Sequence, residues 1–171
     1  ASAEKILHST LIPSSLKPKY QSLVDEIYLK SEQVIHKNWP DDVQIIHGDC
    51  HRSNLLLTED QLYLLDFDDC TTGPQIQDIW LHLSGDIEQQ KQQLSELIEG
   101  YECFHKFDRK QLRLIDPLKS MRLIQYSAWL LDRWTDPAFP KAFPWFASED
   151  YWLGHMAQLK EGLLQWGQLS S

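Results

Sequence analysis

The sequence predicts an α+β fold in which most of the chain is helical and one small β-hairpin is embedded among the helices. Apolar residues recur at helical spacing in several long segments, whereas residues 43–65 contain only short apolar runs of strand length. The chain has 171 residues, of which 42% are hydrophobic and seven are Trp. That length and composition suffice for one folded domain with a substantial core.

Helices are expected on both sides of the hairpin. The first long helix runs from residue 16 to about residue 37 and ends before Pro40. Asp116 and Pro117 are expected to form the N-cap and first turn of a helix that continues through Leu131. Further helices are expected at residues 3–8, 76–83, 89–105, 109–115 and 148–164.

The segment 136–147 interrupts this helical pattern with three prolines and four aromatic residues. A segment of this composition and length is either a functional surface or a packed connector. Because large aromatic side chains usually lie in cores, we expect most aromatic residues of the last third of the chain to be buried rather than to form a substrate platform.

The densest polar pattern lies between residues 43 and 74. Residues 43–46, Leu55–Leu57 and 62–65 are expected to be short strands, with a tight turn at residues 58–61. Three carboxylates follow directly after the last of these strands. Carboxylates packed so closely repel one another unless cations are bound, and Mg²⁺ prefers oxygen ligands. The three residues are Asp66, Asp68 and Asp69.

Composition excludes several classes of protein. The formal net charge of −9 argues against a general grip on nucleic acid, which requires cations for phosphate neutralisation. No apolar run has the length of a membrane span. Three cysteines without paired spacing indicate neither a disulfide framework nor a Cys-x-x-Cys zinc site. We therefore expect a soluble cytoplasmic protein that binds neither nucleic acid nor membrane.

One spacing points to phosphate chemistry. Asp49 and Asn54 lie five positions apart, and the same spacing in the catalytic loop of protein kinases places a base for the substrate hydroxyl beside a metal-binding amide. Asp66 then opens the sequence Asp-Phe-Asp at the end of an expected strand. Protein kinases have Asp-Phe-Gly at that point, so Asp68 replaces a glycine.

The segment His47-Gly-Asp-x-His-x-x-Asn54, followed by Asp66-Phe-Asp, resembles the aminoglycoside phosphotransferase and choline kinase superfamily, which shares the protein-kinase fold. Further segments resemble bacterial serine/threonine protein kinases of the stress-response type within it, and this likeness spans nearly the whole chain. These segments are Thr10-Leu-Ile-Pro-Ser-Ser-Leu-Lys, Gly73-Pro-x-x-Gln-Asp-x-Trp80, Asp136-Pro-Ala-Phe-Pro-Lys-x-Phe-Pro-Trp and Glu149-Asp-Tyr-Trp.

The resemblance implies a role for each matching residue. Asp49 would accept the proton of the attacking hydroxyl, whereas Asn54 and Asp66 would hold Mg²⁺ on the phosphates of ATP, with Asp66 counted as catalytic as well. The implied partners are ATP and a protein substrate. The expected supporting residues are His47, His51 and Asp78.

Other interpretations compete with this one. The polar residues of the loop are also compatible with a structural loop that is capped by its own side chains. A transition-metal site of His47, Asp49 and His51 is chemically feasible, but it leaves Asn54 and Asp66 unexplained. Within the superfamily, a small-molecule kinase for an aminoglycoside, choline or homoserine-like alcohol is the enzymatic rival. A kinase-fold interaction module without catalysis is the non-enzymatic one.

Parts of a kinase are not found in the sequence. It contains no glycine-rich phosphate loop and no Val-Ala-x-Lys strand, and only 46 residues precede His47. We therefore expect residues 1–171 to be the C-terminal lobe of a protein-kinase-like fold, with the hairpin carrying the catalytic and metal residues. Such a lobe requires its N-terminal nucleotide lobe and should have little or no activity alone.

Overall fold

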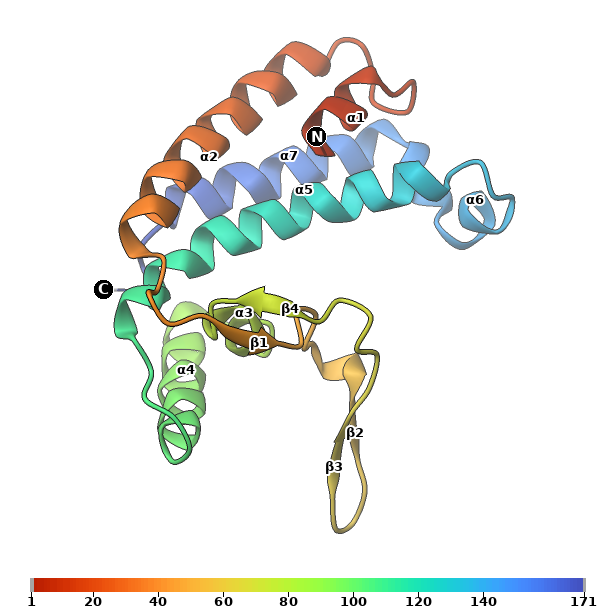
Figure 1. Ribbon diagram of the computed structural model, residues 1–171. Helices are drawn as coiled ribbons and strands as arrows, with labels where there is room; N and C mark the ends of the chain where they lie inside the picture. The colour runs from red at the N-terminus through yellow and green to blue at the C-terminus, as the bar shows by residue number, and fades with distance from the viewer. Residues whose placement is uncertain (1, 171) are drawn as a thin grey trace. The chain divides into compact units, whose positions relative to one another are not determined.

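The computed structural model describes residues 2–170, and the chain divides into two compact units. Unit 1 contains residues 2–33 and Asp116–Trp166, whereas unit 2 contains Val34–Ile115 and residues 167–170. Figure 1 shows that helices dominate and that all strands are short. The predicted fold class, mainly helical with a small antiparallel hairpin, is confirmed.

Unit 1 is helical, and two of its long helices match the prediction closely. Ser148 caps the last helix by accepting a hydrogen bond from the Tyr151 amide, as its position before Glu149 and Asp150 indicates. The described elements are α1 (Ser2–His8), α2 (Lys17–Asn38, whose last five residues belong to unit 2), α5 (Ile115–Arg133), α6 (Ala138–Ala142), η3 (Pro144–Ala147) and α7 (Glu149–Leu164).

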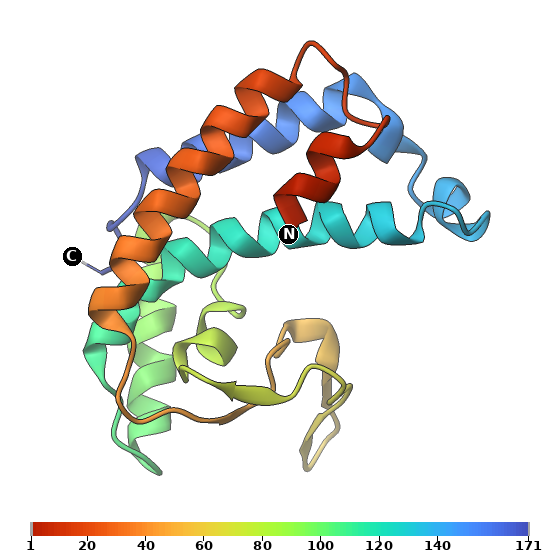
Figure 2. The same ribbon diagram turned by 45° about the horizontal axis from the view of Figure 1, so that its top comes forward.

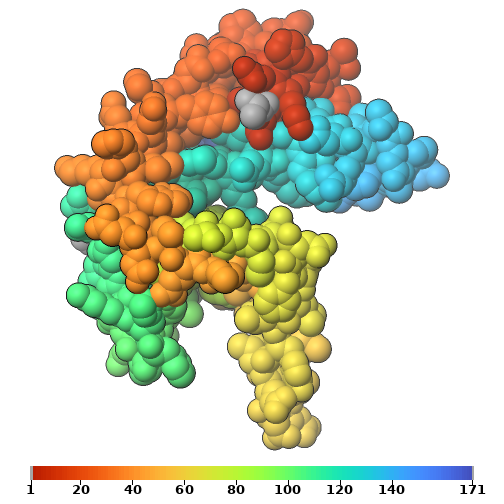
Figure 3. All heavy atoms as spheres, viewed as in Figure 1, coloured from red at the N-terminus to blue at the C-terminus, as the bar shows by residue number. Residues whose placement is uncertain are grey.

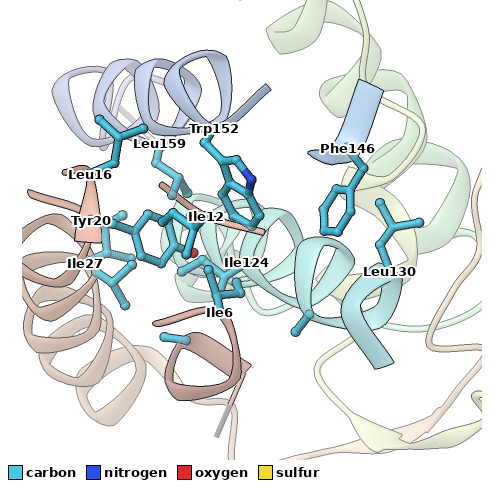
Figure 4. Packing of buried hydrophobic residues seen from close by; sticks show 13 residues of the cluster. Ile6, Ile12, Leu16, Tyr20, Ile27, Ile124, Leu130, Phe146, Trp152 and Leu159 are labelled. Carbon is cyan, nitrogen blue, oxygen red and sulfur yellow. The ribbon is translucent and has the colours of Figure 1, made fainter. Parts of the chain in front are cut away.

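The core of unit 1 joins helices that are distant in sequence. Tyr20 from α2, Ile124 from α5 and Trp152 from α7 point toward one another, and each is at most 1% exposed (Figure 4). The aromatic segment 136–147 contributes to the same core through Phe146, which is fully buried. Phe139 and Phe143 are partly buried against this core, whereas Trp145 is 43% exposed. The segment is therefore a connector with short helical turns that packs against the core through three of its four aromatic residues.

The start of α5 differs from the prediction. Asp116 is not an N-cap, because α5 already begins at Ile115, directly after the 3₁₀ helix η2 (Arg109–Leu114). The amide of Ile115 donates to the Leu112 carbonyl, so the preceding turn satisfies the first helical amides and no separate capping residue is needed. Asp116 lies inside the first turn, where a carboxylate is favourable to the helix dipole.

His155 is a buried histidine in the core of unit 1. Its side chain is 4% exposed, and its Nε2 lies 3.4 Å from the Tyr20 hydroxyl oxygen. The Tyr151 ring stacks on the imidazole with a centroid distance of 5.9 Å. Burial lowers the pKa of His155 to about 4, because the surrounding rings solvate the imidazolium form poorly.

This histidine makes the stability of the chain dependent on pH. In the unfolded chain the free His155 side chain has a pKa near 6.5 and binds a proton below that pH. In the folded chain His155 binds the proton only near pH 4. The free energy of unfolding should therefore decrease by about 3 kcal/mol as the pH falls from 6.5 to 4. Urea unfolding at pH 7 and pH 4.5 measures this loss. His155→Phe should reduce it, whereas His8→Gln, which removes an exposed histidine of the same unit, should not.

Unit 2 contains all the strands found in residues 2–170. Strands β1 and β4 form one antiparallel pair with Ile45 opposite Thr72, and β2 and β3 form the predicted hairpin with Leu56 opposite Tyr63. Figure 2 shows both pairs from a second direction. The elements are β1 (Gln44–Ile46), η1 (Arg52–Asn54), β2 (Leu55–Leu57), β3 (Leu62–Leu64), β4 (Thr71–Gly73), α3 (Ile76–Trp80), α4 (Ile87–Glu102) and η2.

Strand β4 and the helix ends in unit 2 were not predicted. The Thr-Thr-Gly sequence of β4 carries no apolar alternation, and it becomes a strand through its pairing with β1. Helix α3 ends at Trp80 rather than at residue 83. Helix α4 begins two residues earlier than predicted, because Asp86 and Gln89 form a reciprocal capping box.

The hairpin β2–β3 is unusual in exposing apolar side chains on both faces. Leu57 and its cross-strand partner Leu62 are 76% and 59% exposed on one face, and the pair of Leu56 and Tyr63 is 49% and 46% exposed on the other. Figures 1 and 3 show the hairpin as a finger that extends away from α3 and α4. None of the helices in the described part of the chain combines the length and apolarity that crossing a membrane requires.

Candidate active site

The candidate site lies at the base of the hairpin rather than on its strands. Asp49 belongs to the loop between β1 and η1, Asn54 ends η1 immediately before β2, and Asp66 follows β3 after one residue. The Leu65 amide donates to the Asn54 carbonyl at 2.9 Å, which extends the hairpin pairing to its base. Because residues 54 and 65 are thereby paired, Asn54 and Asp66 are held at the same end of the hairpin.

Asp78 fixes the start of the loop. Its carboxylate accepts hydrogen bonds from the backbone amides of His47, at 2.7 Å, and Gly48, at 2.9 Å. Its neighbour on α3, Gln77, donates from Nε2 to the Gly48 carbonyl at 2.9 Å. Hydrogen bonds to a charged acceptor are stronger than neutral ones. One turn of α3 therefore determines the backbone path directly before Asp49.

Gly48 must be glycine for two reasons. Its φ of +85° lies in the left-handed region, and a Cβ atom built there would lie 2.2 Å from the carbonyl oxygen of Asp69. The loop and the segment that carries Asp66 thus approach each other backbone to backbone. Any side chain at residue 48 would push these two segments apart.

His47 connects the same two segments through its side chain. Its imidazole is 5% exposed, and Nε2 donates to the Leu65 carbonyl at 2.8 Å. The ring also lies 4.9 Å from the ring of Phe67. His47 is therefore in direct contact with Leu65 and Phe67, the two residues that flank Asp66.

The side chains of Asp49 and Asn54 are oriented by local contacts. Nδ2 of Asn54 donates to the Asp49 carbonyl at 3.0 Å, so its amide oxygen remains the acceptor end of the side chain. Nε2 of His51 lies 3.3 Å from a carboxylate oxygen of Asp49, and both side chains are partly buried. Asp49 is thus held in a partly buried position with an imidazole beside its carboxylate.

Asp66 has an uncommon backbone conformation. Its φ is +62°, and it is the only residue other than glycine with a positive φ in the part of the chain that the structure describes. Aspartate tolerates this left-handed region better than most residues, but such conformations still cost free energy and are enriched at functional sites. The turn redirects the chain directly after β3, and the side chain of Asp66 is exposed.

The donor set suits one class of cation. The carboxylate of Asp66 and the amide oxygen of Asn54 are hard oxygen ligands, which fit Mg²⁺ when phosphate oxygens and water complete its coordination. The structure does not bring together the residues of the transition-metal alternative. Residues 2–170 contain no group of three or more His, Cys, Asp or Glu arranged to hold a metal, and the His47 imidazole is directed to the Leu65 carbonyl, away from the pair of Asp49 and His51.

Cys50 is not an activated nucleophile. It is buried beside Asp49, and burial together with the charges of Asp78 and Asp49 raises the pKa of its thiol. All three cysteines are free thiols. Cys50 is thus a small buried residue that contributes to packing.

Sequence reasoning missed two residues around the loop. Gln77 holds the Gly48 carbonyl, and Arg52 donates through Nη2 to the His82 carbonyl and the Ser84 hydroxyl, both at 3.2 Å. Gln77 had a signal, since it is one of the residues in the segment Gly73-Pro-x-x-Gln-Asp-x-Trp80, but that segment alone assigned it no role. Arg52 had one signal, since it is the only Lys or Arg between residues 43 and 86.

Comparison with known proteins identifies relatives of this chain. Residues 3–115 match the model of the phosphotransferase enzyme family. Stress response kinase A of Escherichia coli (strain K12) is 44% identical over 155 residues, which are 90% of this chain and 46% of that protein. Serine/threonine protein kinase RdoA of Salmonella typhimurium is 43% identical over 146 residues, which are 84% of this chain and 43% of that protein. These matches confirm the resemblance, and the chain spans about half the length of the curated relatives it matches.

Proposed function

Because the chain belongs to the phosphotransferase enzyme family, we propose that it is the catalytic-loop lobe of an ATP-dependent serine/threonine protein kinase that acts in a stress response. The observation that carries the proposal is the fastening of the loop around Asp49 to the segment around Asp66. Gly48 and His47 make this connection, and Asp78 fixes the start of the loop on α3. Phosphoryl transfer depends mainly on positioning and charge stabilisation, and a loop held in this way supplies the positioning.

Asp49 acts as the base in this proposal. Its carboxylate accepts the proton of the substrate hydroxyl as the hydroxyl oxygen bonds to the γ-phosphorus of ATP and the bond to the β-phosphate oxygen breaks, which releases ADP. His51 lies beside the carboxylate and orients it. The hydrogen bonds that Asp78 accepts from the loop backbone keep Asp49 in position beside the substrate hydroxyl.

Asn54 and Asp66 hold the metal in this proposal. Mg²⁺, when bound with ATP, would neutralise the charge that spreads over the transferred phosphoryl group. The hydrogen bond from Asn54 to the Asp49 carbonyl uses its amide nitrogen and leaves the amide oxygen as the group that would accept the metal. Asp66, in its left-handed turn after β3, has an exposed side chain. His47 keeps these two ligand-bearing segments together.

A second lobe completes the nucleotide site. The apolar side chains that the hairpin exposes require a covering surface, since contiguous exposed apolar groups mark interaction sites. We infer that a nucleotide lobe packs here, and that the 171-residue chain alone transfers little or no phosphate. The three free thiols fit a reducing cytoplasm as the location. The exposed side chains include Leu56, Leu57, Leu62, Tyr63 and Leu64.

A substrate panel tests the protein-kinase proposal. The full-length protein that contains this chain is incubated with Mg²⁺, ATP labelled at the γ-phosphate, a mixture of proteins, and small alcohols including an aminoglycoside, choline and homoserine. We expect label on serine or threonine of proteins. Label on a small alcohol alone would identify a small-molecule kinase instead. Failure of the full-length protein to bind Mg-ATP would favour an interaction module without catalysis.

A further inference from the structure

A cavity of about 310 Å³ borders the catalytic loop in unit 2. The cavity lies beside this loop because Arg52, three residues after Asp49, forms part of the cavity wall. A cavity of this size lies at the small end of the range for ligand sites and suits one side chain rather than a large ligand. The lining residues are Arg52, His82, Gln93, Glu96 and Leu97.

The guanidinium of Arg52 is held in place by neighbouring groups. Nη2 donates to both the His82 carbonyl and the Ser84 hydroxyl. Ser84 is itself clamped by Gln93, whose Oε1 accepts from the Ser84 amide at 2.9 Å and whose Nε2 donates to the Ser84 carbonyl at 3.1 Å. Arg52 is therefore positioned before any ligand arrives.

The remaining donors of Arg52 are available to a ligand. Among residues 2–170, Nη1 and Nε of Arg52 donate no hydrogen bond, and the side chain is exposed. Both hydrogens of Nη2 are used, and a two-pronged contact with a carboxylate requires Nη2, so Nη1 or Nε offers a single charge-assisted hydrogen bond to a carboxylate oxygen. His82, whose pKa is lowered by burial and by the charge of Arg52, adds a neutral imidazole to the wall. Leu97 adds an apolar surface for the stem of a side chain.

We propose that this cavity is a subsite for an acidic side chain of the protein substrate, close in sequence to the accepted serine or threonine. The proposal rests on the protein-kinase function proposed above. Arg52 is the only Lys or Arg among residues 43–86, which carry eight acidic residues. The net charge of this segment disfavours an acidic substrate, so the attraction of an acidic side chain depends on direct contact with the positioned guanidinium of Arg52. Glu96 lies in the same lining and limits the strength of that preference.

Matched peptides test the subsite with the full-length protein. Serine peptides carry Glu or its neutral isostere Gln at successive positions around the serine, and the ratio of their kcat/KM values is measured. A charged hydrogen-bonded pair gives an expected preference of roughly tenfold for the best Glu peptide. Arg52→Gln should reduce this ratio to near one, and Arg52→Lys should retain part of it. Glu96→Gln should increase it.

The control variant is Lys91→Gln. It removes the same charge from α4, but Lys91 does not line the cavity, so the ratio should not change. If Arg52→Gln lowered kcat/KM for both peptides by the same factor, Arg52 would have only a structural role and the proposal would fall. Binding of fluorescent Glu and Gln peptides decides the question without turnover. If the Glu peptide bound the original protein and a thermally stable Arg52→Gln variant with equal affinity, the subsite would be overturned even if no peptide were phosphorylated. Absent phosphorylation alone would instead count against the kinase function.

Discussion

Asp49→Asn in the full-length protein is expected to lower the rate of phosphate transfer by about 10² to 10⁴, which is the usual contribution of a positioned base. Asparagine preserves the size of the side chain but cannot accept the proton of the substrate hydroxyl. The rate of transfer from labelled ATP under saturating Mg²⁺ measures the loss. Nucleotide affinity should change little, because Asp49 does not belong to the proposed metal ligands.

Asp60→Asn is the matched control for this variant. It removes one carboxylate from the turn of the hairpin, where the side chain is exposed and far along the chain from the proposed base. Its transfer rate should equal that of the original protein. A rate loss below threefold in Asp49→Asn would contradict the assignment of Asp49 as the base, and the substrate hydroxyl would then need no protein base.

Asp78→Ala is expected to affect both stability and activity. It removes the acceptor of the His47 and Gly48 amides, and hydrogen bonds to charged groups contribute about 1.5 to 3 kcal/mol each. We therefore expect the free energy of unfolding to fall by about 3 kcal/mol and transfer activity to fall with it. Asp78→Asn should be intermediate, since its single amide oxygen can replace only one of the two acceptors.

Two measurements separate these effects. Urea unfolding gives the loss of stability, and hydrogen exchange of the His47 and Gly48 amides reports on the loop itself. Both amides should exchange faster in Asp78→Ala than in the original protein. Unchanged exchange together with full activity would show that the contacts of Gln77 and His47 suffice to hold the loop.

The sequence predicted the local elements well because their signals are local. Apolar spacing located α2, and the Ser148 cap located the start of α7. The hairpin followed from two short apolar runs around a polar turn. The spacing of Asp49, Asn54 and Asp66 selected the kinase-like interpretation, because the number of residues between the members of a motif limits how they are placed in space.

Features that depend on distant contacts were not predictable. Strand β4 exists through its pairing with β1, and α5 begins one residue before its expected N-cap because η2 leads into it. The close approach of Gly48 to the Asp69 carbonyl joins segments about 20 residues apart. The cavity beside Arg52 likewise required the folded positions of α4 and of the segment that precedes it.

The most direct measurement is Mg²⁺-dependent transfer of labelled γ-phosphate from ATP, made in parallel on the full-length protein and on the isolated 171-residue chain. We expect label on serine or threonine with the full-length protein and at most a trace with the isolated chain. Strong transfer by the isolated chain, abolished by Asp49→Asn, would contradict the need for a second lobe. Transfer by the full-length protein that survives the loss of Asp49 and Asp66 would contradict the catalytic site itself.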